Sequence, residues 1–291
     1  MLKKEFVVSP DFDGKRASDF LRFVLPDLPE SAVRKLFSAR DVKLDGVRVP
    51  GDAAVQAGQV LTAFLPGQSD RQDPSLAVVY EDDDILLVNK RPGISVEDDA
   101  HHGTTLTALC TAYLRGRSPD APPPAACHRL DNQTSGLCLF AKNDRALTVL
   151  QDAFRNRDLE KDYICLVRGI MKPPQAVCKA WLVKDALRGV VRITDRPEPD
   201  AKPIVTAYET LESGPVSRLR VRLMTGRTHQ IRAHLAALGH PVLGDDLYGD
   251  RQFNHRLKSR GLKLCAVSLR LETAGQLPQL DGRVFAIDPP F

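Results

Sequence analysis

The sequence predicts an α+β (mixed α/β) protein with two domains, the larger of which contains a mixed, mostly antiparallel sheet and few helices. After residue 160, short runs rich in β-branched and aromatic residues alternate with Gly, Pro and polar residues, a pattern typical of a large sheet. The chain has 291 residues, which favours two domains. Residues 67–75 have the composition of a linker, so we expect domains over 1–66 and 76–291.

The composition indicates a folded protein and leaves its partners open. Hydrophobic residues make up 43% of the chain, enough for at least one sizeable core. The net charge of +4 allows an RNA partner without requiring one. The six cysteines contain no CxxC pair, which argues against a zinc site or a disulfide framework. No apolar stretch is long enough for a signal sequence or a membrane span, so we expect a cytoplasmic protein.

Residues 1–66 predict a small domain of two helices and a short sheet. The expected elements are helices over 20–25 and 33–37 and strands over 42–44, 47–49 and 59–64. Asp45-Gly46 predicts a two-residue hairpin turn. A cluster of basic residues lies on or just after the second helix, and it is equally compatible with phosphate binding and with a solvated surface. Its members are Arg34, Lys35, Arg40, Lys43 and Arg48.

The larger domain is expected to start with strands and to contain two helices before its main sheet. The expected strands are 77–80, 85–89, 137–141, 163–168, 176–183, 190–193, 204–211, 218–224, 262–269 and 284–287, and the helices are 105–114 and 143–157. Asn143 is a candidate N-cap. Three arginines alternate with apolar residues in one strand, and we interpret them as a solvent-facing surface in preference to an RNA track.

Residues 128–136 (HRLDNQTSG) are the most informative segment of the chain. Thr134-Ser135-Gly136 predicts a tight turn before the buried strand 137–141, so Asp131 is expected at the mouth of a core element. A carboxylate beside an apolar wall is costly unless cations or hydrogen-bond donors compensate it. Asp131 is therefore either a structural residue, as an N-cap or an ion-pair partner, or a group that carries chemistry.

A second polar segment, residues 225–235 (TGRTHQIRAHL), follows a predicted strand. Its apolar residues have helical spacing and predict a helix that begins at Arg227 and ends at Gly239. A helix N-terminus carries free N–H groups and partial positive charge, so with Arg227 it predicts a site for an RNA phosphate or for the carboxylate of Asp131. We expect Arg232 to point elsewhere on the helix and to reach phosphate.

Tyr163 and the histidines have alternative interpretations. Tyr163 is either a core aromatic residue or a side chain that contacts a base or approaches Asp131. His229, His234 and His240 are spaced by five and six residues without an HExxH motif, so no metal is expected. The sequence also lacks GxxxxGK[ST], GxGxxG after a strand and GxSxG, which argues against nucleotide hydrolysis, dinucleotide redox chemistry and the usual esterase chemistry.

Taken together, five motifs resemble those of the RluA-type RNA pseudouridine synthases over residues 76–291. They are LLVNKRPG, HRLDNQTSGLCLFAK, EKDYICLVRG, TGRTHQIRAHL and GDDLYG. Arg91 departs from the usual proline in the first of these motifs. Residues 1–66 resemble the small RNA-binding domain first known from the fourth small-subunit ribosomal protein, although Ala17-Ser18 follows Arg16 where such domains have Leu-Asp.

The resemblance implies that the protein isomerises uridine in RNA, breaking C1′–N1 and making C1′–C5 without a cofactor. Asp131 matches the catalytic aspartate, which either attacks C1′ or removes a proton from C2′. Arg227 matches the basic residue that pairs with it, and Tyr163 and Ile231 match the residues on the two faces of the uracil. Arg129 matches an arginine that fills the space left by the flipped base or contacts phosphate.

The resemblance further implies RNA as the partner, with large-subunit ribosomal RNA expected and transfer RNA as an alternative substrate. We expect a monomer. Two other functions are compatible with parts of the sequence. One is a catalytically silent RNA-binding or ribosome-assembly protein. The other is a metal-dependent RNA hydrolase that uses the histidines with Asp245 and Asp246.

Overall fold

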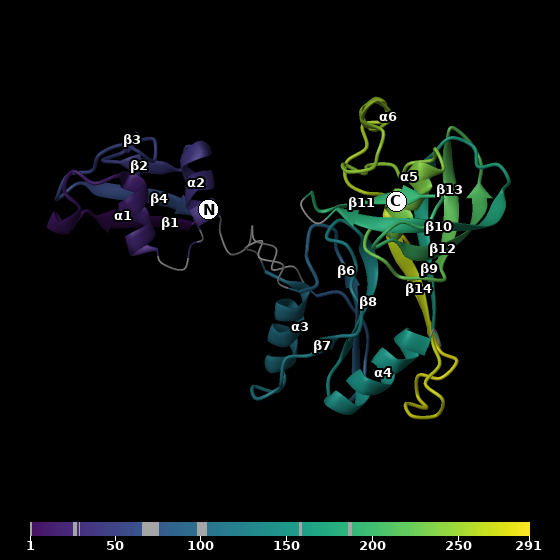
Figure 1. Cartoon of the computed structure of the whole chain (residues 1–291). Helices are drawn as coiled ribbons and strands as arrows, with labels where there is room; N and C mark the ends of the chain where they lie inside the picture. The colour runs from purple at the N-terminus through teal and green to yellow at the C-terminus, as the bar shows by residue number, and fades with distance from the viewer. Residues whose placement is uncertain are drawn as a thin grey trace. The chain divides into compact units, whose positions relative to one another are not determined.

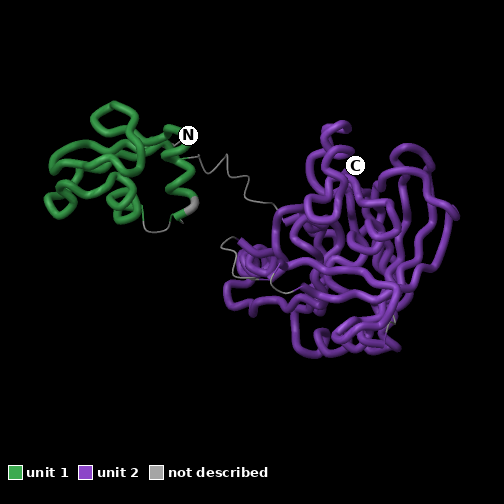
Figure 2. Tube along the Cα trace, turned by 45° about the horizontal axis from the view of Figure 1, so that its top comes forward, with its two compact units in different colours: residues 1–75 green, residues 76–291 purple. Residues whose placement is uncertain are grey.

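A computed structural model describes residues 2–25, 28, 30–65, 76–97, 104–156, 159–185 and 188–291. The chain divides into two compact units, Met1–Ser75 and Leu76–Phe291 (Figure 2). The expected linker and the pair His101-His102 lie outside the described residues. Within the described part of the chain, no helix is both long and apolar enough to span a membrane.

The first unit is a four-stranded sheet with two helices. Its elements are β1 (Leu2–Val7), the 3-10 helix η1 (Pro10–Phe12), α1 (Ala17–Val24), α2 (Glu30–Ser38), β2 (Val42–Leu44), β3 (Val47–Arg48) and β4 (Val60–Leu65). The strand order is β1-β4-β2-β3 and every pair is antiparallel. Asp45 and Gly46 both have positive φ, 48° and 84°, as the expected two-residue hairpin turn requires.

Strand β1 is the one element of this sheet that the sequence did not predict. Lys3, Lys4, Glu5 and Val7 are all exposed, so the strand has little of the apolar alternation by which a strand is recognised. It is held instead by its antiparallel pairing along β4, from Leu2 opposite Leu65 to Val7 opposite Val60.

The second unit contains one large sheet. Its elements are β5 (Val78–Glu81), β6 (Ile85–Lys90), α3 (Leu106–Arg115), β7 (Ala125–Ala126), β8 (Ser135–Ala141), α4 (Asp144–Asn156), β9 (Leu159–Arg168), β10 (Gln175–Asp185), β11 (Val190–Thr194), β12 (Lys202–Glu212), β13 (Val216–Leu223), α5 (Gln230–Ala237), α6 (Arg251–Arg256), β14 (Leu264–Leu271) and β15 (Val284–Ala286). The main order is β11-β10-β12-β13-β9-β14-β8-β6-β5, with β15 beside β14 and β7 beside β8. Only β14 and β8 run parallel among these pairs, so the expected mixed, mostly antiparallel sheet is confirmed (Figure 1).

Strand β8 lies in the middle of this unit and is buried throughout. Cys138 and Phe140 pack into the core that also contains residues of α3, whereas Leu137 and Leu139 pack into the core that contains residues of α4. Because neighbouring residues of a strand point to opposite faces, α3 and α4 cover opposite faces of the sheet. Asn143 caps α4 as expected, since its Oδ1 accepts a hydrogen bond of 2.8 Å from the N–H of Ala146.

Gly136 fixes the point where the segment before β8 joins the sheet. It pairs with Ala266 of β14 and has φ +114°, and a Cβ atom there would collide with the backbone carbonyl of Ala266. Glycine is the one residue that accepts both this φ and this contact. Residues 128–134, which contain Asp131, therefore end against a fixed backbone position, although the predicted turn residues Ser135 and Gly136 belong to the strand itself.

Candidate active site

Lys90 anchors the loop that carries Asp131. Its ammonium donates hydrogen bonds to the carbonyl oxygens of Arg91 at 3.1 Å, Ile94 at 2.8 Å and Asn132 at 2.8 Å. The side chain is fully buried, and burial lowers the pKa of Lys90 to about 8. The carbonyl of Asn132 also accepts from the N–H of Gly93 at 2.9 Å. These bonds join the loop after β6 to the residue that follows Asp131 and limit the movement of the carboxylate.

Arg232 lies between two carboxylates. Its Nε and Nη2 atoms donate to Oδ2 and Oδ1 of Asp245 at 2.7 and 2.9 Å, and its Nη1 donates to Oδ2 of Asp131 at 3.3 Å. Burial alone would raise the pKa of Asp245, but hydrogen bonds and charge from Arg232 and two backbone N–H groups outweigh it, so the pKa is lowered. Asp245 thus fixes the position of the guanidinium. The carboxylate of Asp131, which is more exposed than that of Asp245, contacts the remaining nitrogen, Nη1.

The expected pairing of Asp131 with Arg227 is absent, and the expectation that Arg232 points away is wrong. The side chain of Arg227 is exposed and forms no ion pair within the described residues. The reason is the start of α5, which begins at Gln230 and not at Arg227. The Gln230 side chain accepts from the N–H of Arg227 at 3.1 Å and donates to Thr206 at 3.0 Å, which folds the preceding residues into a turn and directs Arg232 inward.

His229 and Tyr248 complete the surroundings of Asp131. The Tyr248 hydroxyl accepts from the N–H of Val191 at 2.8 Å and lies 2.9 Å from His229 Nδ1, and we assign its own proton to a hydrogen bond with Nδ1. The remaining proton of a neutral ring is then on Nε2, which lies 3.9 Å from Asp131 Oδ2. Burial lowers the pKa of His229, against the opposing charge of Asp131, so the ring is neutral near pH 7. The sequence prediction did not include these two residues in the site.

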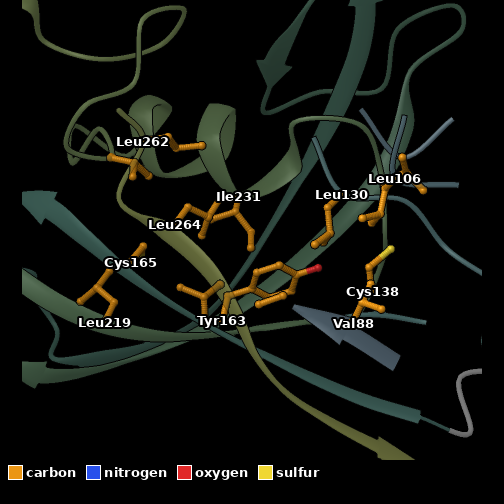
Figure 3. Packing of buried hydrophobic residues seen from close by; sticks show 14 of the residues in the cluster. Val88, Leu106, Leu130, Cys138, Tyr163, Cys165, Leu219, Ile231, Leu262 and Leu264 are labelled. Carbon is orange, nitrogen blue, oxygen red and sulfur yellow. The ribbon is translucent and has the colours of Figure 1, made fainter. Parts of the chain in front are cut away.

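Tyr163 and Ile231 form an apolar part of the same site. Both are almost fully buried, Tyr163 on β9 and Ile231 on α5. Figure 3 shows the Tyr163 ring beneath Ile231, with its hydroxyl directed toward Leu130 and Cys138. Burial, followed by the charge of Asp131, raises the pKa of Tyr163, so the phenol stays protonated at neutral pH. Its hydroxyl makes no hydrogen bond within the part of the chain that the structure describes.

A cleft of about 1440 Å³ brings most of the predicted site residues together. Its lining includes polar and apolar side chains from the loop before β8, from β9 and from α5. The predicted residues among them are Arg129, Asp131, Tyr163, Arg227, Ile231 and Arg232. Arg129 is exposed in this lining. The volume exceeds what a single small molecule fills, so the cleft has room for a nucleotide and its neighbours in a chain.

The basic residues predicted to bind RNA in the first unit remain at its surface. Arg34, Lys35 and Arg40 are exposed, and Arg34 forms an ion pair of 2.6 Å with Glu30. The ammonium of Lys43 lies 5.4 Å from the centre of the Phe64 ring. The three arginines of β13 are each paired with a carboxylate, and Arg222 also lines the cleft. The pairs are Arg218–Glu212, Arg220–Glu209 and Arg222–Asp162.

The histidines make protein contacts in place of the metal cluster considered above. His234 Nδ1 lies 3.0 Å from Thr206 Oγ1, and His240 Nδ1 lies 2.9 Å from the carbonyl oxygen of Arg168. Both carboxylate oxygens of Asp245 accept hydrogen bonds. Across the described ranges, no three His, Cys, Asp or Glu side chains are grouped as metal ligands.

Comparison with known proteins gives consistent similarities over most of the chain. Residues 84–237 match the family model described as RNA pseudouridylate synthase. The ribosomal large subunit pseudouridine synthase C of Vibrio vulnificus is 34% identical over 270 residues, covering 88% of this chain and 83% of that protein. The Escherichia coli protein of the same name is 31% identical over 300 residues, covering 99% and 92%. The solved human RNA pseudouridylate synthase domain containing 1 covers 78% of this chain and 87% of its own, with a TM-score of 0.61 and 29% identity.

Proposed function

Since this chain belongs to the RNA pseudouridylate synthase family and isomerises uridine in RNA to pseudouridine, we propose that Asp131 is the residue that acts on the ribose of the target uridine. The supporting observation is the position of its carboxylate. Oδ2 faces both Arg232 and His229, at 3.3 and 3.9 Å, while Oδ1 makes no hydrogen bond with the described residues. One oxygen is thus held in place and the other is available at the cleft.

This arrangement suits both chemical routes open to a carboxylate. Oδ1 either attacks C1′ as the C1′–N1 bond breaks, or it accepts the proton from C2′. Each route starts from the carboxylate form of Asp131, whose Oδ2 the guanidinium of Arg232 contacts at 3.3 Å. Because Arg232 is shared with Asp245, it orients Asp131 without fully neutralising it. Arg232 accordingly takes the role that the sequence assigned to Arg227.

The uracil is held between Tyr163 and Ile231 in this proposal. Their buried side chains provide an aromatic and an aliphatic surface on β9 and α5, and both line the cleft with Asp131. The protonated hydroxyl of Tyr163 is available to donate to the base after it has left its stack. Arg129 and Arg227, exposed in the lining, contact the RNA backbone around the flipped nucleotide.

We infer that large-subunit ribosomal RNA is the substrate, with transfer RNA as the alternative outcome of the test. The curated relatives that span most of the chain are named as ribosomal large subunit enzymes. The first unit binds the RNA outside the cleft through basic side chains on and after α2, namely Arg34, Lys35, Arg40 and Lys43. We further propose that the protein is cytoplasmic and acts as a monomer. Light scattering on the purified protein tests the monomeric state, and cell fractionation tests the location.

Mapping of pseudouridines in cells tests the function and the substrate together. We expect deletion of the gene to remove defined pseudouridines from large-subunit ribosomal RNA, detected by carbodiimide-dependent primer extension. The wild-type gene and the control Asp195→Asn, an exposed aspartate outside the cleft lining, should restore them. Asp131→Asn should not. Restoration of the pseudouridines by Asp131→Asn would overturn the proposed role of Asp131. If the deletion removed pseudouridines only from transfer RNA, transfer RNA would replace large-subunit ribosomal RNA as the substrate.

A further inference from the structure

Lys161 is a cation in the cleft that the proposed reaction leaves without a role. It lies two residues before Tyr163 on β9, so both side chains are on the same face of the strand, and both line the cleft. Its ammonium lies 4.7 Å from the centre of the Phe154 ring on α4. Within the described residues no carboxylate forms an ion pair with it. Burial lowers the pKa of Lys161 to about 8.

Lys90 shows how this fold compensates a lysine that it buries for structural reasons. Its ammonium has the same lowered pKa, but it donates to three backbone carbonyl oxygens. Lys161 has the face of an aromatic ring, which compensates a desolvated ammonium only in part. A partly buried cation without a hydrogen-bonded partner is unfavourable, and an anion that enters the cleft reduces this penalty.

His128 places a second donor without an acceptor beside the same ring. Its imidazole lies 5.0 Å from Phe154, and its Nε2 accepts from the N–H of Leu139 at 3.3 Å. The proton of the neutral ring is therefore on Nδ1, which is buried and has no hydrogen-bond partner among the described residues. The ring is neutral, since burial and then the charge of Lys161 hold the pKa of His128 well below its usual value.

We propose that Lys161, resting on Phe154, is a phosphate subsite that binds the RNA chain next to the target uridine. The subsite rests on the proposed function, because it positions the nucleotide that Asp131 and Tyr163 act on. The Cα atoms of residues two apart in a strand are about 6.6 Å apart, so the side chains of Lys161 and Tyr163 leave β9 at points separated by roughly the length of one nucleotide. A lysine recognises phosphate as a point charge and does not read the base, so the subsite sets the register of the chain.

The test uses the full chain with Asp131→Asn, which prevents turnover, and a synthetic RNA that contains the target uridine. Single methylphosphonates replace the flanking phosphates one at a time, and affinity is measured at several salt concentrations. Adding Lys161→Met should weaken binding roughly tenfold and reduce the salt slope by about one. At one position, a methylphosphonate in place of the phosphate should weaken RNA binding to the protein that keeps Lys161. The same replacement should not weaken RNA binding to the Lys161→Met protein any further.

Two further variants make this result specific. Lys179→Met removes an exposed strand lysine outside the cleft lining, and it should leave the linkage effect unchanged. Lys161→Arg keeps the charge and should keep the salt slope. The subsite would be overturned if the protein with Lys161 and the Lys161→Met protein gave the same dependence on the position of the methylphosphonate. It would also be overturned if Lys161→Met, introduced into the protein that keeps Asp131, abolished turnover while RNA affinity and its salt slope were unchanged. Conversion of the same RNA by the wild type reports separately on the proposed function.

Discussion

Arg232 Nη1 lies 3.3 Å from Asp131 Oδ2, joining α5 to the loop before β8 across 101 positions of sequence. The same guanidinium donates two shorter hydrogen bonds to Asp245. Its position is therefore determined by Asp245, and Asp131 receives the one edge that remains. This geometry separates the two arginines of the TGRTHQIR segment into one that orients the carboxylate and one, Arg227, that faces the cleft.

Arg232→Lys should lower kcat by at least roughly a hundredfold, because lysine cannot contact Asp245 through two atoms and Asp131 through a third. Breaking this buried network should also cost about 3–5 kcal/mol of unfolding free energy. Arg227→Met is the matched control, and it should leave kcat within about threefold while weakening RNA binding. Single-turnover kinetics and urea denaturation measure these effects. If Arg227→Met lowered kcat strongly and Arg232→Lys did not, Arg227 would be the partner of Asp131, as first expected.

Tyr248→Phe should lower kcat roughly tenfold with little change in RNA affinity. The Tyr248 hydroxyl sets which nitrogen of His229 carries the proton, and the substitution removes it. Phenylalanine keeps the aromatic ring, whose centre lies 5.3 Å from the Arg232 guanidinium. The double variant Tyr248→Phe with His229→Asn should be no slower than His229→Asn alone, since both changes remove one interaction with Asp131. Additive losses would show that Tyr248 acts independently of His229.

The sequence was sufficient for the fold class because Gly, Pro and polar residues separate the strands clearly. It missed β1, whose exposed side chains carry little apolar alternation. It also placed the start of α5 too early, because the Gln230 side chain closes a turn that apolar spacing does not reveal. The pairing of Asp131 with Arg227 was implied by the resemblance and was compatible with that early helix start, whereas the observed helix directs Arg232 toward Asp131.

The site was predictable where a motif placed a residue at the end of a buried strand or on a buried face. Asp131, Tyr163 and Ile231 line one cleft for this reason. The residues that orient them depend on tertiary contacts, which no local pattern contains. The GDDLYG motif contains Asp245 and Tyr248. Their roles could not be predicted from it, because they depend on contacts with Arg232 and His229 earlier in the chain.

Gly136→Ala should destabilise the second unit by more than about 3 kcal/mol or prevent folding, because the added carbon would collide with the backbone of β14 at a φ of +114°. Gly275→Ala is the matched control. It also has positive φ, +80°, but open space around the added carbon, so it should cost only about 1 kcal/mol. Thermal unfolding of both proteins measures the difference, and equal losses would show that φ alone matters.

Lys90→Met should destabilise the protein and reduce turnover together. Three carbonyl oxygens would lose the ammonium as a donor, although that of Asn132 keeps the N–H of Gly93, and each group left buried and unpaired costs about 1–3 kcal/mol. The loop that carries Asp131 would keep only the hydrogen bond from Gly93 of the two at the Asn132 carbonyl, so kcat should fall more than RNA affinity. Guanidinium denaturation and single-turnover assays measure both effects. Unchanged kcat in a destabilised variant would show that the loop is positioned by its other contacts.

Lys161→Met should have the opposite effect on stability. Lys90 is fully buried and Lys161 is partly buried, and burial lowers the pKa of both lysines to about 8. The folded pKa lies below the unfolded value of 10.5, so the unfolded state binds more protons between these values and wild-type stability rises with pH across that window. Below about pH 8, Lys161 is charged in both the folded and the unfolded state, so the wild type carries the full free-energy cost of burying that charge. The Met variant should therefore be more stable by about 1–3 kcal/mol at pH 7.

The pH profile distinguishes this effect from better packing of methionine. The difference in unfolding free energy between variant and wild type should shrink from pH 8 to 10.5, because it follows the charge of Lys161. Its titratable neighbours stay uncharged in this range, since burial raises the pKa of the Cys138 thiol and lowers that of His128. A pH-independent gain would indicate packing. A loss of stability would show that Lys161 already has a partner in the free protein, which would remove the reason for an anion to bind there.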